Sequence, residues 1–300
     1  MGIGPSPPSR RTERLPAAEI AARYGLAPAA ARPSLLAYLR ELWGRRHFLV
    51  AFTRGKVTAR YARASLGALW QVLTPMLQGA VYLLLFGLLL QVHRGVDNFI
   101  GFLAVGVFIF SFTSHAMNRG ARAISGNLGL VRALHFPRAT LPLAFTLAEL
   151  RLLGPSLVVL AVIVLLTGEP LTAAWLLVPA AVALQFLFNI GVALVMARIG
   201  AHMRDVQQVL PFITRTWLYL SGIFFSIPTV ARRLPEAIGP ILMFNPAAVY
   251  IDLVRRSLLS GHDASLQIPH AWPVGAAWAV VVLVIGFVFF WQAEEQYGRG

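Results

Sequence analysis

The stretch Arg54–Pro75, RGKVTARYARASLGALWQVLTP, changes its physical character within a few residues. Its first half carries four cations, Arg54, Lys56, Arg60 and Arg63, and the next charged residue is Arg94. Arginines near a helix end prefer anionic headgroups, whereas a long apolar run prefers the hydrocarbon core of a bilayer. The stretch therefore predicts the point at which a basic surface segment enters a membrane-spanning helix.

The composition of the whole chain agrees with this interpretation. Of its 300 residues, 57% are hydrophobic and only 13% are charged, which is too apolar for a soluble domain with a wetted surface. The formal net charge of +14 does not indicate nucleic-acid binding, because the cations lie in the N-terminal segment and in short loops instead of on one basic face. We expect an all-α membrane protein without a nucleic-acid partner.

Several kinds of chemistry are not expected from this chain. It has no cysteine, and its seven histidines show no metal-ligand spacing, so no metal site is predicted. A P-loop is also excluded, because Lys56, the sole lysine, has Val50 and Val57 where that motif requires glycine and serine or threonine. We therefore predict no catalytic residue and no cofactor, and any ATP must be bound by another polypeptide.

The apolar pattern divides the chain into a tail and a transmembrane domain. Residues 1–33 are rich in arginine and proline, which predicts a flexible cytoplasmic tail, and residues 34–300 form the transmembrane domain. An amphipathic helix over 34–60, with Ser34 as its N-cap, is expected to lie in the membrane interface. Six spans of about 20 residues or more follow, at about 66–91, 99–118, 139–167, 172–198, 206–227 and 272–292.

The placement of the arginines predicts the orientation. With a cytoplasmic N-terminus, the basic N-terminal segment and the arginines that follow the second and fourth spans all lie inside. The outside then receives fewer cations, namely Arg94, Arg232, Arg233, Arg255 and Arg256. Both termini are therefore expected in the cytoplasm.

Two connections are too long to be simple turns. The loop 119–137 places Ile124, Leu128 and Val131 on one helical face, which predicts a short cytoplasmic surface helix. The connection 228–270 is apolar and is interrupted at Asn245-Pro246, with candidate short helices at 237–244 and 246–261. Because neither helix is long enough to span, an outer re-entrant helical hairpin is expected.

Four groups of residues together resemble the ABC transporter permeases that export polysaccharides such as O-antigen, teichoic acid, capsule and galactan. The resemblance covers about residues 34–292. It is carried by the entry motif Arg60, Tyr61, Arg63, Ser65, Leu66, Gly67, Trp70 and Pro75; by Asn127, Leu130, Phe136, Pro137, Arg138, Leu141 and Pro142; by Arg204, Asp205, Val206, Leu210 and Pro211; and by Asn245, Pro246, Tyr250 and Arg255.

This resemblance implies a permease that exports a lipid-linked polysaccharide across a bacterial inner membrane. It implies a homodimer bound to two copies of a separate ATP-binding subunit, so that the chain is not itself an enzyme. The loop 119–137 would be the coupling helix, with Arg122, Asn127, Leu130, Arg132, Phe136 and Pro137 facing the ATPase. Arg60, Tyr61, Arg63, Ser65 and Trp70 would meet the substrate headgroup at the entry.

Aromatic residues and charges inside the spans allow two interpretations each. Tyr82, Phe86, Phe108, Phe112, Trp217 and Phe225 are candidate channel residues, because sugar rings pack on aromatic faces, but they also suit lipid contact and packing. The intramembrane charges Glu149, Arg151 and Arg215 would suit ion coupling, or a structural pair such as Glu149 with Arg215.

Two further functions stay open at this point. One is a permease for drugs or small lipids, which shares the architecture. The other is a membrane-embedded glycosyl- or phosphotransferase, which would need clustered acidic residues to hold a metal. Only Glu294 and Glu295 form such a cluster, and they lie at the end of the chain.

Overall fold

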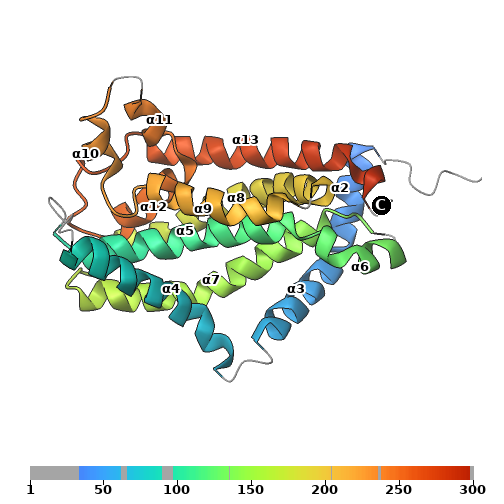
Figure 1. Cartoon of the computed structure of the whole chain (residues 1–300), viewed down its shortest axis with the longest axis horizontal. Coiled ribbons are helices and arrows are strands. Elements are labelled where there is room, and N and C mark those ends of the chain that lie inside the picture. Colours follow the sequence, from blue (N-terminus) through green and yellow to red (C-terminus); the bar gives the residue numbers. More distant parts are fainter. Residues whose placement is uncertain are drawn as a thin grey trace, which may run out of the picture. The chain divides into compact units, whose positions relative to one another are not determined.

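The computed structural model describes residues 34–61, 66–89, 97–134, 136–203, 205–235 and 238–297. Within these ranges all regular secondary structure is helical (Figure 1). The all-α class predicted from the sequence is confirmed for this part of the chain. The predicted tail of residues 1–33 lies outside the described residues.

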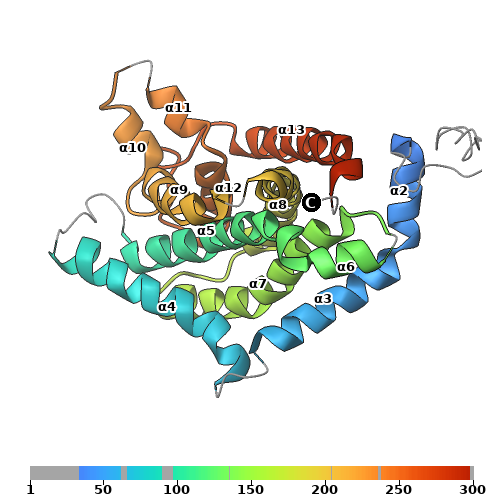
Figure 2. The ribbon, with the colours of Figure 1, turned by 45° about the vertical axis from the view of Figure 1, so that its right-hand side comes forward.

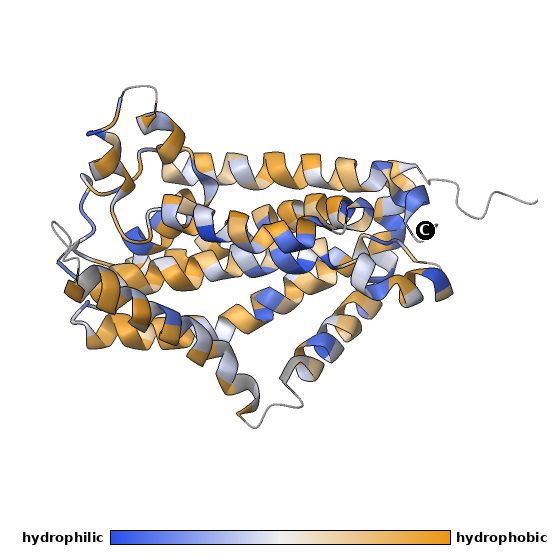
Figure 3. Ribbon diagram, viewed as in Figure 1, coloured by the Kyte–Doolittle hydropathy of each residue, from blue (hydrophilic) through white to orange (hydrophobic). Residues whose placement is uncertain are grey.

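Four helical segments in the described ranges are long and apolar enough to cross a membrane. They are α5 (Phe99–Ala121), α7 (Thr140–Leu166), η4 (Ala173–Leu177) joined to α8 (Val178–His202), and α13 (Ala271–Gln292). Their 23, 27, 30 and 22 residues meet the length of about 20 that a bilayer core requires. They correspond to the second, third, fourth and sixth predicted spans, and Figure 3 shows their largely hydrophobic ribbons.

The first predicted span is divided into pieces. It consists of the 3₁₀ turn η1 (Gly67–Leu69), α4 (Trp70–Tyr82) and the π-helical η2 (Leu83–Leu89). Pro75 lies inside α4, as expected for a proline that bends a helix without ending it. The apolar helical part, Val72–Leu85, is shorter than the four segments of spanning length.

The predicted end of the fifth span, at residue 227, is wrong. Helix α9 (Val206–Leu220) has 15 residues, so it is about 22 Å long, against a hydrocarbon core of about 30 Å. It ends in a turn at Ser221 and Gly222, and Gly222 has a φ of +67°, which glycine adopts without a steric cost. Apolar composition continues through this turn, and for that reason the sequence did not reveal it.

Helix α8 packs between α5 and α13 (Figures 1 and 2). Where α8 crosses α13, Gly191 and Gly286 lie so close together that a Cβ on either would overlap the backbone of the other helix. Gly200 lies equally close to the backbone of Ala121 in α5. Small residues allow such close backbone approach in membrane proteins, where no water is expelled to drive helix association. These glycines therefore decide the helix spacing.

The predicted outer hairpin forms three short helices, α10 (Ile227–Ala231), α11 (Gly239–Met243) and α12 (Pro246–Leu258). The break predicted at Asn245-Pro246 is confirmed, because Asn245 caps α12 by accepting a hydrogen bond from the Ala247 amide at 3.1 Å. Helix α12 packs against α5, α8 and α13, and its side chains are almost all buried. It therefore belongs to the core instead of covering the surface.

The helix predicted over 34–60 is interrupted. It forms α2 (Leu35–Gly44) and α3 (Arg46–Tyr61), with Arg45 in a turn between them. The predicted N-cap is confirmed, since Ser34 Oγ accepts a hydrogen bond from the Ala37 amide. Tyr38 is buried, whereas Trp43, also in α2, is 72% exposed. The apolar residues of α2 therefore do not all pack against the rest of the protein.

Candidate functional site

Residues 119–137, which we call the coupling segment, connect α5 to α7. They contain the 3₁₀ turn η3 (Ser125–Asn127) and the short helix α6 (Leu128–Ala133), so this loop is helical in two short pieces instead of one continuous helix. Ile124 and Val131 are buried against the core, as the helical spacing indicated. Of the predicted coupling residues, Arg122 and Arg132 are exposed, Pro137 is buried, and the others are partly buried, namely Asn127, Leu130 and Phe136. The segment thus presents a basic outer face on an apolar base.

Two side chains from other helices hold the coupling segment. Lys56 Nζ in α3 donates a hydrogen bond to Asn127 Oδ1 at 3.1 Å, and Asn127 Nδ2 donates in turn to the Ala123 carbonyl. Gln207 Nε2 in α9 donates to Ser125 Oγ at 2.8 Å. These two hydrogen bonds tie the segment to both α3 and α9.

A second cluster fastens α2 to the C-terminal turn η5 (Glu294–Gln296). Tyr38 OH donates to Glu294 Oε2 at 2.8 Å and accepts a hydrogen bond from the Ala139 amide at 3.0 Å. The Arg138 amide donates to Glu294 Oε1 at 2.9 Å. Burial raises the pKa of Glu294 and of Tyr38 above their ordinary values, although the hydrogen bond from Arg138 opposes the shift for Glu294. The cluster joins α2, the start of α7 and the end of α13.

The suggested pairing of Glu149 with Arg215 is wrong. Glu149 is 4% exposed and forms an ion pair with Arg119 Nε, and its Oε2 lies 3.6 Å from His115 Nδ1. Both partners belong to α5, which packs directly against α7. Arg151 and Arg215 are exposed on α7 and α9. The acidic side chain therefore lies in a structural ion pair between adjacent helices, which the sequence alone could not select among several arginines.

The candidate channel aromatics occupy different environments. Phe108 and Phe112 in α5 are each only 3% exposed. Tyr82 in α4 packs edge-on against Phe224 with ring centroids 5.1 Å apart. Trp217 Nε1 donates a hydrogen bond to Asn245 Oδ1 at 2.9 Å, and Phe225 is partly buried. The side chain of Phe86 lies outside the described part of the structure.

The predicted entry residues lie mostly outside the described part of the structure. Arg63 and Ser65 are among the residues left undescribed, and so are the side chains of Arg60 and Tyr61. Trp70 is described, and it is 40% exposed at the start of α4. It lines a cavity together with Phe108, Phe112 and Glu149.

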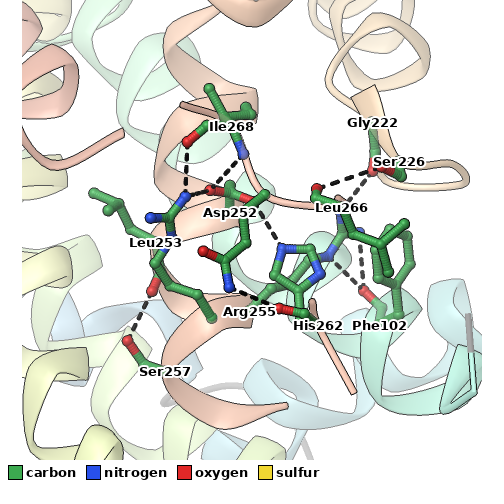
Figure 4. A network of polar contacts seen from close by, with 12 residues as sticks. Phe102, Gly222, Ser226, Asp252, Leu253, Arg255, Ser257, His262, Leu266 and Ile268 are labelled. Carbon is green, nitrogen blue, oxygen red and sulfur yellow. Dashed lines mark hydrogen bonds and ion pairs between the residues drawn. The ribbon is translucent and has the colours of Figure 1, made fainter. Parts of the chain in front are cut away.

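A buried polar network around Arg255 was missed in the sequence, where this residue counted as an outer loop charge. Arg255 is 4% exposed (Figure 4). Its guanidinium donates to the carbonyl oxygens of Phe102, Gly222 and Ile223 at 2.8 to 3.1 Å and lies over the Phe102 ring. One signal in the sequence could have indicated this burial. Arg255 lies inside the apolar helical sequence PAAVYIDLVRRSLL, on the helical face that the apolar residues bury.

Asp252, one turn before Arg256, organises the neighbouring loop. Its carboxylate forms an ion pair with Arg256, lies 2.8 Å from His262 Nε2, and accepts a hydrogen bond from the Ile268 amide at 3.2 Å (Figure 4). The network therefore fixes α12 against α5, against the turn after α9 and against the loop before α13. It holds no group of three or more potential metal ligands, nor do the other described residues.

The helices of spanning length, the apolar core with its buried polar network and the basic segment between α5 and α7 define a polytopic helical membrane protein. Residues 47–259 match the family model of the ABC-2 type transporter, and the chain belongs to this family. The resemblance found in the sequence motifs is thereby confirmed.

Curated relatives extend the similarity over most of the chain. The O-antigen export system permease protein RfbA of Myxococcus xanthus is 27% identical over 258 residues, which are 84% of this chain and 93% of the relative. The polysialic acid transport protein KpsM of Escherichia coli is 24% identical over 80% of this chain and 91% of its own length. The capsule polysaccharide export inner-membrane protein CtrC of Neisseria meningitidis is 22% identical over 71% of this chain and 81% of its own length.

Proposed function

We propose that this chain is the permease subunit of an ABC transporter that exports a lipid-linked polysaccharide across a bacterial inner membrane. The observation that carries the proposal is the similarity of the chain, over most of its length, to relatives named as export proteins for O-antigen, polysialic acid and capsule. Galactan and teichoic acid stay possible cargoes of the same chemical class.

ATP binding and hydrolysis belong, in this proposal, to a separate subunit, and two copies of it serve a homodimer of the permease. The exposed Arg122 and Arg132 on the coupling segment supply the basic face for that contact. The hydrogen bonds from Lys56 and Gln207 then carry the motion of the segment to α3 and α9. Coupling of this kind needs a segment that is packed firmly on the bundle, and buried Ile124 and Val131 supply that packing.

The proposal includes six spans with both termini in the cytoplasm. The coupling segment lies near α2 and the C-terminus, while α10 and α11 lie at the opposite ends of the long helices (Figure 1). Because the chain has no cysteine, single cysteines can report the orientation without a background. We expect Gly126→Cys to react with an impermeant maleimide only after the membrane is opened, and Ala264→Cys to react in intact spheroplasts. The reverse pattern would overturn the orientation.

The central experiment is purification of the chain in mild detergent from its native membrane, with mass spectrometry of the proteins that accompany it. We expect a stoichiometric partner that contains a P-loop, and ATP hydrolysis by the complex. Deletion of the gene for this chain should also leave a lipid-linked glycan inside the cell. A chain that purifies without such a partner in several detergents, with no change in surface glycan on deletion, would contradict the proposal.

A further inference from the structure

Two neighbouring cavities share the lining residues Glu149 and Leu152, one between α4, α5 and α7 and the other between α3, α5 and α7. The first is lined by Trp70, Thr74, Phe108, His115 and Glu149, among others. The second has a volume of about 260 Å³ and is lined by Lys56, Ala59, Arg119, Phe145, Glu149 and neighbouring residues. The second volume is many times the roughly 10–15 Å³ that a single water requires. The space is therefore large enough for a polar group bigger than water.

The charge of the second cavity favours an anion. Its wall carries two cations, Lys56 and Arg119, against the one carboxylate of Glu149, for a net charge of +1. Lys56 Nζ lies 5.0 Å and 5.3 Å from the ring centroids of Phe52 and Phe145, so that its ammonium group stands at the cavity between two aromatic rings. An ammonium group has three donors, and one of them reaches Asn127.

The surroundings favour an amphiphile over a free ion. Thr74 lines the first cavity, and one and two turns further along α4 the same helical face carries Leu77 and Val81. These two side chains are 52% and 54% exposed. An apolar chain can therefore extend from the cavity along α4, while Lys56 and Arg119 meet a charged head.

We propose that this crevice, lined by Lys56, Arg119 and Glu149, binds the phosphate head of an anionic amphiphile. Lys56 and Arg119 neutralise the phosphate oxygens through charge-assisted hydrogen bonds, and Glu149 limits the net charge of the site. The amphiphile is either a membrane phospholipid or an isoprenoid diphosphate of the kind that carries a glycan, since both present the same phosphate chemistry and an apolar chain.

Lys56 links this site to the coupling segment. The same ammonium group donates to Asn127 in η3, so a phosphate that draws Lys56 toward the crevice also changes the geometry of its hydrogen bond to Asn127. Occupancy of the site thereby changes how firmly the coupling segment is held. This consequence rests on the function proposed above, whereas binding of the amphiphile does not, and the two are measured separately.

The test uses the purified full-length chain in neutral maltoside micelles, with Ala59→Cys labelled by an environment-sensitive bimane. Ala59 lines the second cavity, and the label is unique because the native chain has no cysteine. The probes are dioctanoyl phosphatidic acid, farnesyl diphosphate, dioctanoyl phosphatidylcholine and inorganic pyrophosphate. We expect a saturable response to at least one anionic amphiphile, at least about tenfold tighter than to the zwitterionic lipid. The tighter of the two anionic probes identifies the source of the phosphate.

Removing a positive charge and removing a negative charge from the cavity wall should change the affinity for the amphiphile in opposite directions. Lys56→Gln should weaken binding by about tenfold or more, whereas Glu149→Gln should tighten it, because the net charge of the wall falls in one case and rises in the other. The same label on exposed Ala51→Cys, also in α3 but outside the cavity, should not respond.

Several results would overturn the proposal. These are no saturable response to either anionic amphiphile, equal affinity for phosphatidylcholine, equal affinity for inorganic pyrophosphate, or binding that Lys56→Gln leaves unchanged. Each variant must first show a monodisperse elution profile and an unchanged melting temperature in maltoside. If Glu149→Gln fails this check, Lys56→Gln alone decides, because it removes a positive charge of the wall without altering the ion pair of Glu149. Because no ATPase partner is present, failure here leaves the transporter assignment untouched.

Discussion

Arg255 Nη1 donates a hydrogen bond to the Gly222 carbonyl oxygen, 2.8 Å away, and thereby joins α12 to the turn that ends α9. The same guanidinium also bonds the carbonyl oxygens of Phe102 in α5 and Ile223. One buried cation thus holds three segments that are far apart in the chain. Its charge is balanced by carbonyl dipoles and by the Phe102 ring; burial lowers the pKa of Arg255, and the nearby Asp252 only partly offsets this.

Replacement of Arg255 should destabilise the protein strongly. Arg255→Ala leaves the Gly222 and Ile223 carbonyls without this donor in a buried site, and each such group costs about 1–3 kcal/mol. We expect a clear fall in the apparent melting temperature in detergent. Arg233→Ala, which removes an exposed arginine of the same region, is the control and should change it little. Equal melting temperatures for the two variants would refute this role of Arg255.

The crossing of α8 and α13 should not tolerate side chains. Gly191→Val places a branched side chain against the backbone of Val282, and we expect a loss of about 3 kcal/mol or a failure to fold. Gly154→Val in α7 is the matched control, because nothing lies within 4 Å of a Cβ at that position. Size-exclusion profiles and melting temperatures compare the two. A Gly191→Val protein as stable as the control would show that the helices can separate without cost.

The basic face of the coupling segment should decide the association with an ATP-binding subunit. We expect the double variant Arg122→Glu and Arg132→Glu to reduce the amount of co-purified partner by about tenfold or more, because charge reversal at an interface is repulsive. The single variant Arg233→Glu, in an exposed position after α10, should leave the partner bound. Quantitative mass spectrometry measures the ratio. An unchanged ratio in the double variant would place the contact elsewhere.

Glu169 should make the stability depend on pH. Burial raises its pKa, but hydrogen bonds from the Ser260 amide and hydroxyl, both at 2.7 Å, and from Asn98 outweigh burial and lower the pKa below its ordinary value. Because the pKa of Glu169 is lower in the folded state, its charge stabilises the protein fully when the pH is above the unfolded-state pKa of about 4.3. This stabilisation is lost as the pH falls through the folded-state pKa.

Glu169→Gln tests this dependence directly. The difference in melting temperature between the native chain and the variant should be largest at neutral pH and should shrink as the pH falls below the unfolded-state pKa of about 4.3. Glu295→Gln, in η5, serves as the comparison for a carboxylate of another region. A difference that stays constant with pH would mean that the charge of Glu169 contributes nothing to stability.

The amino-acid sequence determined the class of protein, because long apolar runs and the placement of arginines report directly on the bilayer as a solvent. It also determined local features that depend on neighbouring residues: the Ser34 cap, the Asn245 break before α12, and the burial of Ile124 and Val131 in the loop between α5 and α7. Its motifs were sufficient to indicate the family.

The tertiary structure decided which distant groups meet. Glu149 pairs with Arg119 because α5 and α7 are adjacent, Arg255 is buried because α12 packs inward, and Lys56 reaches Asn127 because α3 passes the coupling segment. It also showed where α9 ends and where the interfacial helix turns at Arg45. In an apolar chain many helix arrangements satisfy the same hydropathy pattern. The choice among them rests on close backbone contacts, such as that of Gly191 with Gly286, and on buried polar pairs, which have no periodic signature in the sequence.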